Sequence, residues 1–460
     1  MNEKKQGLFC FFAVASVALA ASIECFWGLL FRQKSVILCL TFVVFELDDP
    51  PGEDLMKTIK RNRFIYYLAR GISRLAACFL FKSTVLRNEI KGKKGPFTII
   101  ANHQSALDFV TLIGATRAPM TYVISRSFYD TLPVKGAIER MGVIPKQQFQ
   151  THIDELRKMR SVVAEGGILV IYPAGLMTED GLSTPIPDAT YRFLQWIGTD
   201  IYVARASGTY FVLPKWGKGV RPGRTYMDIY KLFSREELAD MPIGDIRRMT
   251  DEAMQFDAYA DQERLRIKYR RASVIEGLEN VLYVCPHCHR EFTMRVRDKR
   301  VIYCTECGYA ERCDAYGFLH LEGEIGEEIR HISTWSRGIY EALRAKMERG
   351  IEDVIATGVR VQMIDEKQKK FVDVGAGEIT LSRYGFRFVG TVRGEEKNTV
   401  IGISNFASLP FKPGYYFEIQ HSDDIYRCYP TDGRMTMKII NIVKIFYEQS
   451  LATVHGIRGE

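Results

Sequence analysis

A junction between a buried strand and a helix constrains this chain more than any other feature. Residues 97–101 read F-T-I-I-A, and an apolar run with β-branched side chains favours a buried strand. The run breaks off at Asn102 and His103, and residues 104–113 then carry apolar side chains at helical spacing. We therefore expect His103 and Asp108 to lie where a buried strand passes into a helix, which is a place suited to chemistry.

His103 and Asp108 together suggest a general base. A neutral imidazole can accept the proton of an alcohol, and a carboxylate on its other nitrogen would fix the tautomer and stabilise the imidazolium. The chain has no Ser or Cys in an elbow motif, so the simplest scheme is direct attack by a substrate hydroxyl, with His103 as the base. The alternative for a lone His near a helix start is a capping or packing role.

The neighbouring residues extend this pattern. Asn-His-x-x-x-x-Asp after an apolar strand resembles the first motif of the 1-acylglycerol-3-phosphate acyltransferase superfamily. Three later segments resemble the family's second, third and fourth motifs in the same order, namely residues 136–146, 167–175 and 210–214. The resemblance covers roughly residues 55–235. It implies an α/β acyltransferase domain in which His103 and Asp108 are catalytic and no catalytic cofactor is needed.

The same resemblance implies the substrates. The donor would be acyl-CoA or acyl carrier protein, and the acceptor would be 1-acylglycerol-3-phosphate or another lysophospholipid. In the family the third motif ends in Pro-Glu-Gly-Thr-Arg, whose charged residues help to hold the phosphate, whereas Pro173 to Met177 here read P-A-G-L-M. A neutral Met cannot imitate the bidentate contact of an arginine. Either the acceptor differs, or other residues hold the phosphate, or catalysis has been lost.

Five residues are expected to bind substrate. Lys146 matches the basic residue of the second motif, and Arg126 and Lys215 are further cations expected to add to a phosphate contact. Asn102 belongs to the first motif, and a backbone N–H near Gly175 is expected to stabilise the oxyanion. The alternative for each cation is an ordinary solvated surface charge.

The N-terminus reads as a membrane anchor. Residues 7–23 form an uncharged run of 17 residues, and apolar residues continue past Glu24 to Phe31. A second apolar run, residues 35–45, is too short to cross a bilayer unaided. A re-entrant or interfacial hairpin fits both runs. The alternative is a cleaved signal peptide, because Ala18-Leu19-Ala20 has the form of a cleavage site.

A basic amphipathic helix is expected next. Its apolar face carries five side chains at spacings of three and four, namely Phe64, Leu68, Ile72, Leu75 and Phe79. Lysines and arginines surround this face, so the helix suits the headgroup layer of a membrane. The alternative is that the same face packs on the enzyme core.

Two cysteine knuckles predict a metal site. Cys285-x-x-Cys288 and Cys304-x-x-Cys307 are separated by fifteen residues, which is typical of a four-cysteine structural zinc ribbon. The alternative is a pair of disulfides. A thiolate site favours a reducing compartment, and hence the cytoplasmic face of a membrane. We expect the ribbon to act as a folded spacer or a protein contact.

The C-terminal part changes its periodicity from helix to strand. Trp335, Ile339, Leu343 and Met347 predict a helix, and apolar residues then alternate with a period of two from Val359 onward. A last helix carries Met435, Ile439, Ile442 and Phe446. Short antiparallel strands closed by one helix resemble a pleckstrin-homology-type barrel, which would bind lipid headgroups or proteins.

Length and charge complete the sequence-based interpretation. A chain of 460 residues with 47% hydrophobic residues has room for several domains. We divide it into a membrane anchor hairpin (1–50), an acyltransferase domain (51–235), a helical extension (236–280), a zinc ribbon (281–320) and a helix with a barrel-like domain (321–460). A net charge of +8 suits a membrane surface or phosphate-bearing substrates, and nucleic acid is not expected as a partner.

The sequence therefore predicts an acyltransferase that is bound to a membrane with its active site facing the cytoplasm. It would transfer an acyl group to a lysolipid. The alternative from another class is a non-catalytic lipid-binding adaptor that keeps the acyltransferase fold.

Overall fold

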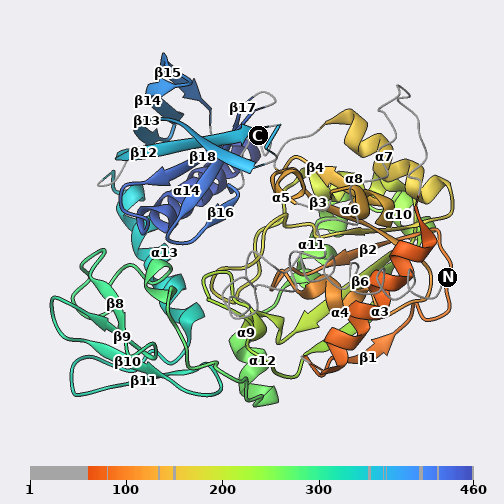
Figure 1. Cartoon of the computed structure of the whole chain (residues 1–460), viewed down its shortest axis with the longest axis horizontal. Coiled ribbons are helices and arrows are strands. Elements are labelled where there is room, and N and C mark those ends of the chain that lie inside the picture. The colour runs from red at the N-terminus through yellow and green to blue at the C-terminus, as the bar shows by residue number, and fades with distance from the viewer. Residues whose placement is uncertain are drawn as a thin grey trace, which may run out of the picture.

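The structure is a computed structural model that describes residues 61–79, 81–132, 135–148, 152–350, 354–365, 367–368, 370–402, 408–421 and 424–457. The predicted membrane hairpin, residues 1–50, and the first residues of the predicted acyltransferase domain lie outside the described residues. Figure 1 shows three groups of elements: a sheet with helices around it, a small sheet in green, and a second large sheet in blue with the C-terminal helix.

The first sheet has seven strands in the order β1-β7-β6-β2-β5-β3-β4. The strands are β1 (Thr84–Asn88), β2 (Phe97–Ala101), β3 (Met120–Ser125), β4 (Val143–Lys146), β5 (Ile168–Ile171), β6 (Ile201–Ser207) and β7 (Tyr226–Phe233). All neighbours pair in parallel except β6 and β7. The predicted strand at residues 97–101 is confirmed as the fully buried β2, because β5 and β6 flank it in the sheet.

Helices surround this sheet, and their bounds are α3 (Arg63–Phe79), α4 (Asp108–Leu112), α5 (Arg126–Thr131), α6 (Lys135–Met141), α7 (Ile153–Ala164), α8 (Ala189–Ile197) and α9 (Thr209–Val212). The helix predicted over residues 104–113 is shorter than expected. The Asp108 carboxylate accepts the backbone N–H groups of Gln104 and Ser105, at 2.8 and 3.0 Å, so these residues form a turn and the helix begins at Asp108.

The amphipathic helix α3 exposes much of the apolar face that its periodicity defines. Phe64, Leu75 and Phe79 are 66%, 54% and 76% exposed. The side that packs on the domain carries Tyr66 and Ala69, each 1% exposed. These three side chains therefore do not pack on the core of the domain. Among the described residues, no helix combines the length and apolarity needed to cross a bilayer.

A helical segment follows the first sheet. It contains α10 (Arg235–Asp240), α11 (Ile243–Met254) and α12 (Ala258–Leu265), and a short 3-10 turn, η1 (Leu278–Asn280), comes later. Ser234 and Glu237 form a capping box at the start of α10. The Gln262 side chain donates to the carbonyls of Ile267 and Tyr316, so α12 is tied to the small sheet that follows.

The small sheet has four strands in the order β11-β10-β9-β8. They are β8 (Met294–Arg297), β9 (Val301–Cys304), β10 (Ala310–Cys313) and β11 (Leu319–Leu321), and α13 (Ile332–Glu348) follows them. All pairs are antiparallel. The predicted apolar face of α13 is confirmed, since Trp335, Ile339, Leu343 and Met347 are all buried.

The C-terminal part is mostly β, as predicted. Its seven strands are β12 (Val354–Asp365), β13 (Lys370–Ser382), β14 (Gly385–Val392), β15 (Glu395–Ile401), β16 (Phe411–Lys412), β17 (Tyr416–His421) and β18 (Asp424–Pro430), and α14 (Met435–Ile457) ends the chain. They pair antiparallel in the order β15-β14-β13-β12-β18-β17-β16. The likeness to a pleckstrin-homology barrel stays a prediction.

One hydrophobic cluster joins all three groups of elements. It includes Leu107 and Leu176 from the loops of the first sheet, Tyr309 from the small sheet, Trp335 of α13 and Ile440 of α14. The small sheet therefore packs into a core that it shares with the first domain.

Candidate active site

His103 and Asp108 form a hydrogen-bonded pair at the carboxyl end of β2. The Nδ1 atom of His103 lies 2.9 Å from Oδ2 of Asp108. The imidazole is 22% exposed, whereas the carboxylate is 2% exposed. This arrangement leaves Nε2 as the ring nitrogen that faces a reacting group, and it places a fixed negative charge behind Nδ1.

The pair is held rigidly by its surroundings. The same Asp108 oxygen accepts two backbone N–H groups, so the carboxylate cannot rotate away from His103. The ring of Tyr172 lies against the imidazole, with ring centroids 4.3 Å apart. Burial raises the pKa of Tyr172 well above its ordinary value, with a smaller contribution from the Asp108 charge. The phenol therefore stays neutral, and sequence reasoning missed this contact between the two rings.

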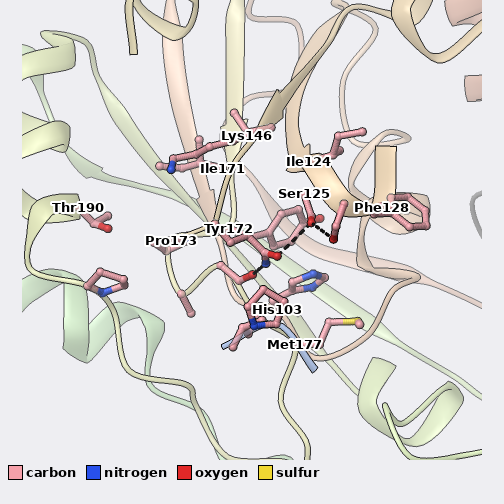
Figure 2. A pocket seen from close by; sticks show the side chains of 18 of the residues that line it. His103, Ile124, Ser125, Phe128, Lys146, Ile171, Tyr172, Pro173, Met177 and Thr190 are labelled. Carbon is pink, nitrogen blue, oxygen red and sulfur yellow. Dashed lines mark hydrogen bonds between the residues drawn. The ribbon is translucent and has the colours of Figure 1, made fainter. Parts of the chain in front are cut away.

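His103 opens into a large cavity of about 1450 Å³. The wall from the first domain consists largely of apolar and aromatic side chains, among them Phe109, Ile124, Phe128 and Met159. Figure 2 shows His103 beside Tyr172 and Met177, with Phe128 on one side of the view and Lys146 further along the pocket. An apolar cavity lined by a histidine with a carboxylate behind it suits a long hydrocarbon chain with a reactive carbonyl at its end.

The loop after β5 forms the cavity wall nearest to His103. Gly175 has a positive φ of 70°, and its N–H donates to the carbonyl of Tyr172 at 2.9 Å, while its own carbonyl accepts from Gln148. The N–H of Thr178 donates to the His103 carbonyl at 3.0 Å and fixes the loop on the catalytic turn. Gly175 itself therefore shapes the loop, and its N–H is not directed at a substrate.

Two of the predicted substrate-binding cations lie on the cavity. Lys146 donates to the carbonyl of Gln147 at 2.9 Å and lies 3.9 Å from Glu155. Lys215 donates to the carbonyl of Met177 at 3.4 Å, and its Nζ lies 3.3 Å from the centre of the Phe411 ring. Burial lowers the pKa of Lys146 and lowers that of Lys215 to about 7, although neighbouring carboxylates act in the opposite direction.

The other two predicted residues are not brought to this cavity. The Arg126 side chain is 53% exposed and pairs with Asp130 at 2.7 Å, although its neighbours Ser125 and Ser127 line the cavity. Asn102 is 4% exposed, and its amide makes two hydrogen bonds to the backbone of Ala206 in β6, at 2.7 and 2.9 Å. The geometry gives Asn102 the role of joining two strands at the catalytic turn.

A buried ion pair links the catalytic loop to the end of the chain. Glu179, which follows the loop after β5, pairs with Lys444 of α14. Burial alone would raise the pKa of Glu179, but the ammonium groups of Lys444 and Lys215 outweigh it and leave the pKa below its usual value. The pair spans 265 residues, so no local pattern in the sequence indicates it.

The four cysteines of the knuckles converge beside the small sheet. Their sulfur atoms all lie within 4.8 Å of one another, with 3.6 Å between Cys285 and Cys307 and 3.7 Å between Cys288 and Cys304. All four are free thiols rather than disulfides. Tetrahedral zinc with Zn–S bonds of about 2.3 Å requires sulfur atoms about 3.8 Å apart, so these residues fit such an ion.

Comparison with known proteins gives three findings. Residues 82–212 match a family model described as Acyltransferase. Among solved structures, the chain is similar to the 1-acyl-sn-glycerophosphate (LPA) acyltransferase PlsC from Thermotoga maritima, with 16% sequence identity, coverage of 57% of this chain and 96% of that chain, and a TM-score of 0.37. No curated protein matches the chain.

Proposed function

We propose that this chain is a membrane-associated O-acyltransferase, because residues 82–212 match a family model described as Acyltransferase. It moves a fatty acyl group from a thioester donor, acyl-CoA or acyl carrier protein, to a hydroxyl of a lysophospholipid. The observation that carries this proposal is the His103–Asp108 pair at 2.9 Å, opening into an apolar cavity of about 1450 Å³.

The proposed reaction needs one proton carrier. Nε2 of His103 accepts the proton of the acceptor hydroxyl as its oxygen attacks the thioester carbonyl. The tetrahedral intermediate then collapses, the carbon–sulfur bond breaks, and the leaving thiolate takes the proton from the imidazolium. Asp108 keeps the proton on Nδ1 and stabilises the positive charge that His103 carries between these two steps. The products are an ester and a free thiol, so no redox step or catalytic cofactor takes part.

The loop after β5 is the proposed source of oxyanion stabilisation. The Gly175 N–H donates to the Tyr172 carbonyl. Within the described structure, the N–H groups of Leu176 and Met177 have no backbone acceptor. Both residues line the cavity beside His103. Fixed backbone donors near a developing negative charge lower the barrier without reorganisation.

Lys215 and Lys146 are the proposed contacts of the acceptor phosphate. Lys215 lies beside Met177, which stands where the family carries an arginine, and it makes no ion pair within the described structure. A phosphate at this point would meet a cation that burial leaves poorly solvated, so the attraction between them is strong. This supports retention of phosphate-bearing acceptors despite the neutral third motif.

Membrane association is proposed through α3. Its exposed apolar side chains, Phe64, Leu75 and Phe79, lie on a helix that also carries Arg63 and Arg74. Such a helix suits the headgroup layer of an anionic membrane. The apolar runs at residues 7–31 and 35–45 precede it in the sequence, and the substrates are themselves lipids.

The proposed location is the cytoplasmic face of the membrane, with a structural zinc ion held by Cys285, Cys288, Cys304 and Cys307. The four thiols lie together without forming disulfides, and zinc thiolate sites persist in reducing compartments. The ion would add folding energy and take no part in the chemistry.

The test of the proposed function is transfer of labelled acyl groups from acyl-CoA and acyl carrier protein to a panel of lysolipids that includes lysophosphatidic acid. His103→Ala should lower kcat by about 10²- to 10⁴-fold, which is the usual contribution of a general base. The matched control is His320→Ala on β11, a residue that does not line the cavity, which should keep its activity. Absence of transfer by a folded, zinc-loaded protein with vesicles present would instead favour the lipid-binding adaptor.

A further inference from the structure

The strand β17 has buried polar residues on the face of the sheet that points away from the core of the C-terminal domain. Phe417 and Ile419 point into the C-terminal domain and are 0% and 3% exposed. Glu418 and Gln420 alternate with them, so they lie on the opposite face of the sheet, yet they are only 1% and 3% exposed. Both of these polar residues line the cavity that contains His103. The C-terminal sheet therefore forms part of the candidate active site.

This second wall is attached firmly to the first domain. Phe411 of β16 lies over the Lys215 ammonium, and the buried pair of Glu179 and Lys444 joins α14 to the loop beside His103. β16 pairs with β17, so Phe411 and Gln420 belong to the same edge of the C-terminal sheet. The contacts made by β16 and by α14 therefore hold the C-terminal sheet against the first domain, with the polar face of β17 lining the cavity.

Gln420 differs from its neighbour in its hydrogen bonding. The Glu418 carboxylate accepts two hydrogen bonds from Arg427, at 2.8 and 2.9 Å. The Oε1 atom of Gln420 is buried, and none of the described protein groups donates to it. A buried acceptor without a donor is costly. Because Gln420 lines the cavity, a ligand that binds there can supply this donor.

The size of the cavity also indicates that the acceptor has a headgroup larger than a phosphomonoester. Typical small-molecule pockets span about 300–1,000 Å³, whereas this cavity measures about 1450 Å³ and extends from His103 to the C-terminal sheet. There is room for an acyl chain along the apolar wall and for a polar headgroup that reaches beyond Lys215.

Resting on the proposed function, we propose that the C-terminal sheet is the acceptor-selecting wall of the cavity and that Gln420 is a specificity-determining residue. Its amide oxygen accepts a hydrogen bond from a hydroxyl or ammonium group of the acceptor headgroup. The acceptor class is then a phosphodiester lysophospholipid with a donor beyond its phosphate, such as an ethanolamine or glycerol headgroup. The phosphate lies toward Lys215, and the headgroup reaches Gln420.

The test compares Gln420→Leu with wild type on lysophospholipids that share one acyl chain. Lysophosphatidylethanolamine and lysophosphatidylglycerol carry donors, whereas lysophosphatidylcholine keeps the phosphodiester but has none. We expect kcat/KM to fall by about 10-fold for the two donor-bearing acceptors and to stay within about 2-fold for the choline acceptor. Gln362→Leu, on β12 of the same sheet but not among the residues that line the cavity, is the matched control. An equal loss for all headgroups, or no loss for any, would overturn the proposal.

A binding experiment separates this inference from the proposed function. Lysolipid analogues that lack the acceptor hydroxyl cannot be acylated, so their affinity is measurable whether or not the protein is an acyltransferase. Titration of the full chain in detergent should show about 10-fold weaker binding of the ethanolamine analogue to Gln420→Leu, with the choline analogue unchanged. Equal affinity of wild type and variant for the ethanolamine analogue would reject a role for Gln420, even if transfer activity is found.

Discussion

The two walls of the cavity are built in different ways. His103, Tyr172 and Met177 lie on loops that follow β2 and β5, which are neighbours in one parallel sheet. Phe411 and Gln420 come from an antiparallel sheet near the end of the chain, which is attached through the Glu179–Lys444 pair. The first wall holds the groups that suit proton transfer, and the second holds groups that suit recognition. Chemistry and selectivity are therefore expected to respond to different substitutions.

Removal of the metal should have the largest effect, because it should disturb both walls together. The four-cysteine sheet shares one hydrophobic cluster with the catalytic loops and with α14. Structural zinc sites contribute on the order of 10 kcal/mol to folding. Cys304→Ser, or treatment with a chelator, should lower the melting temperature and abolish transfer to every acceptor. Calorimetry and metal analysis on the same sample check this, and full stability without bound metal would contradict it.

Asp108→Asn should affect only the wall that carries His103. The amide oxygen of Asn can still accept the N–H groups of Gln104 and Ser105, so the turn is kept, but the charge behind Nδ1 is lost. We expect kcat to fall by about 10²- to 10⁴-fold with KM nearly unchanged and the ranking of headgroups preserved. Steady-state kinetics with two headgroups measure this. A changed ranking would mean that the walls are not separable.

Lys215 lies where the two walls meet and should give a pH-dependent effect. Burial lowers its pKa to about 7, so the free enzyme loses this charge as the pH rises through that value. The KM for a phosphate-bearing acceptor should therefore rise above pH 7. Lys215→Met should raise KM by about 10-fold or more at pH 6, whereas Lys215→Arg, which stays charged, should flatten the profile between pH 6 and 8. An unchanged profile in the arginine variant would remove Lys215 from phosphate binding.

The smallest effect on the cavity is expected from α3, which lies outside both walls. Leu75→Ser should weaken binding to anionic vesicles by about 10-fold, because an apolar side chain contributes roughly 1.5–3 kcal/mol when it is buried. Transfer in detergent should stay unchanged. Vesicle sedimentation tests the prediction, with Ile65→Ser elsewhere on α3 as a comparison. If vesicle binding is unaltered, this face of α3 does not bind the membrane.

The motif-based part of the site was predictable because it depends on local sequence. The buried strand at residues 97–101 and the spacing of His103 and Asp108 determine where both side chains lie, and the four cysteines converge as their spacing predicts. The helix from residue 104 was predicted too long, because periodicity does not show that the Asp108 carboxylate takes up the N–H groups of Gln104 and Ser105.

The second wall was not predictable from local patterns. Alternation in β17 identifies Phe417 and Ile419 as core residues, but it assigns Gln420 to a solvated face. The partner that buries Gln420 is far away in the chain. The helices α3 and α13 show the same limit, since both have apolar residues at spacings of three and four. The face of α13 is buried, whereas Phe79 on α3 is 76% exposed. Periodicity identifies an apolar face but not what covers it.

The central claim is that one wall of the cavity carries out the chemistry and the other selects the acceptor. The most direct test is one transfer assay on wild type, His103→Ala and Gln420→Leu, with ethanolamine, glycerol and choline acceptors measured in parallel. We predict that His103→Ala lowers kcat for all three headgroups by the same factor. Gln420→Leu should lower kcat/KM only for the ethanolamine and glycerol acceptors. The same headgroup profile in both variants, or full transfer by His103→Ala, would contradict the assignment of chemistry to one wall and selectivity to the other.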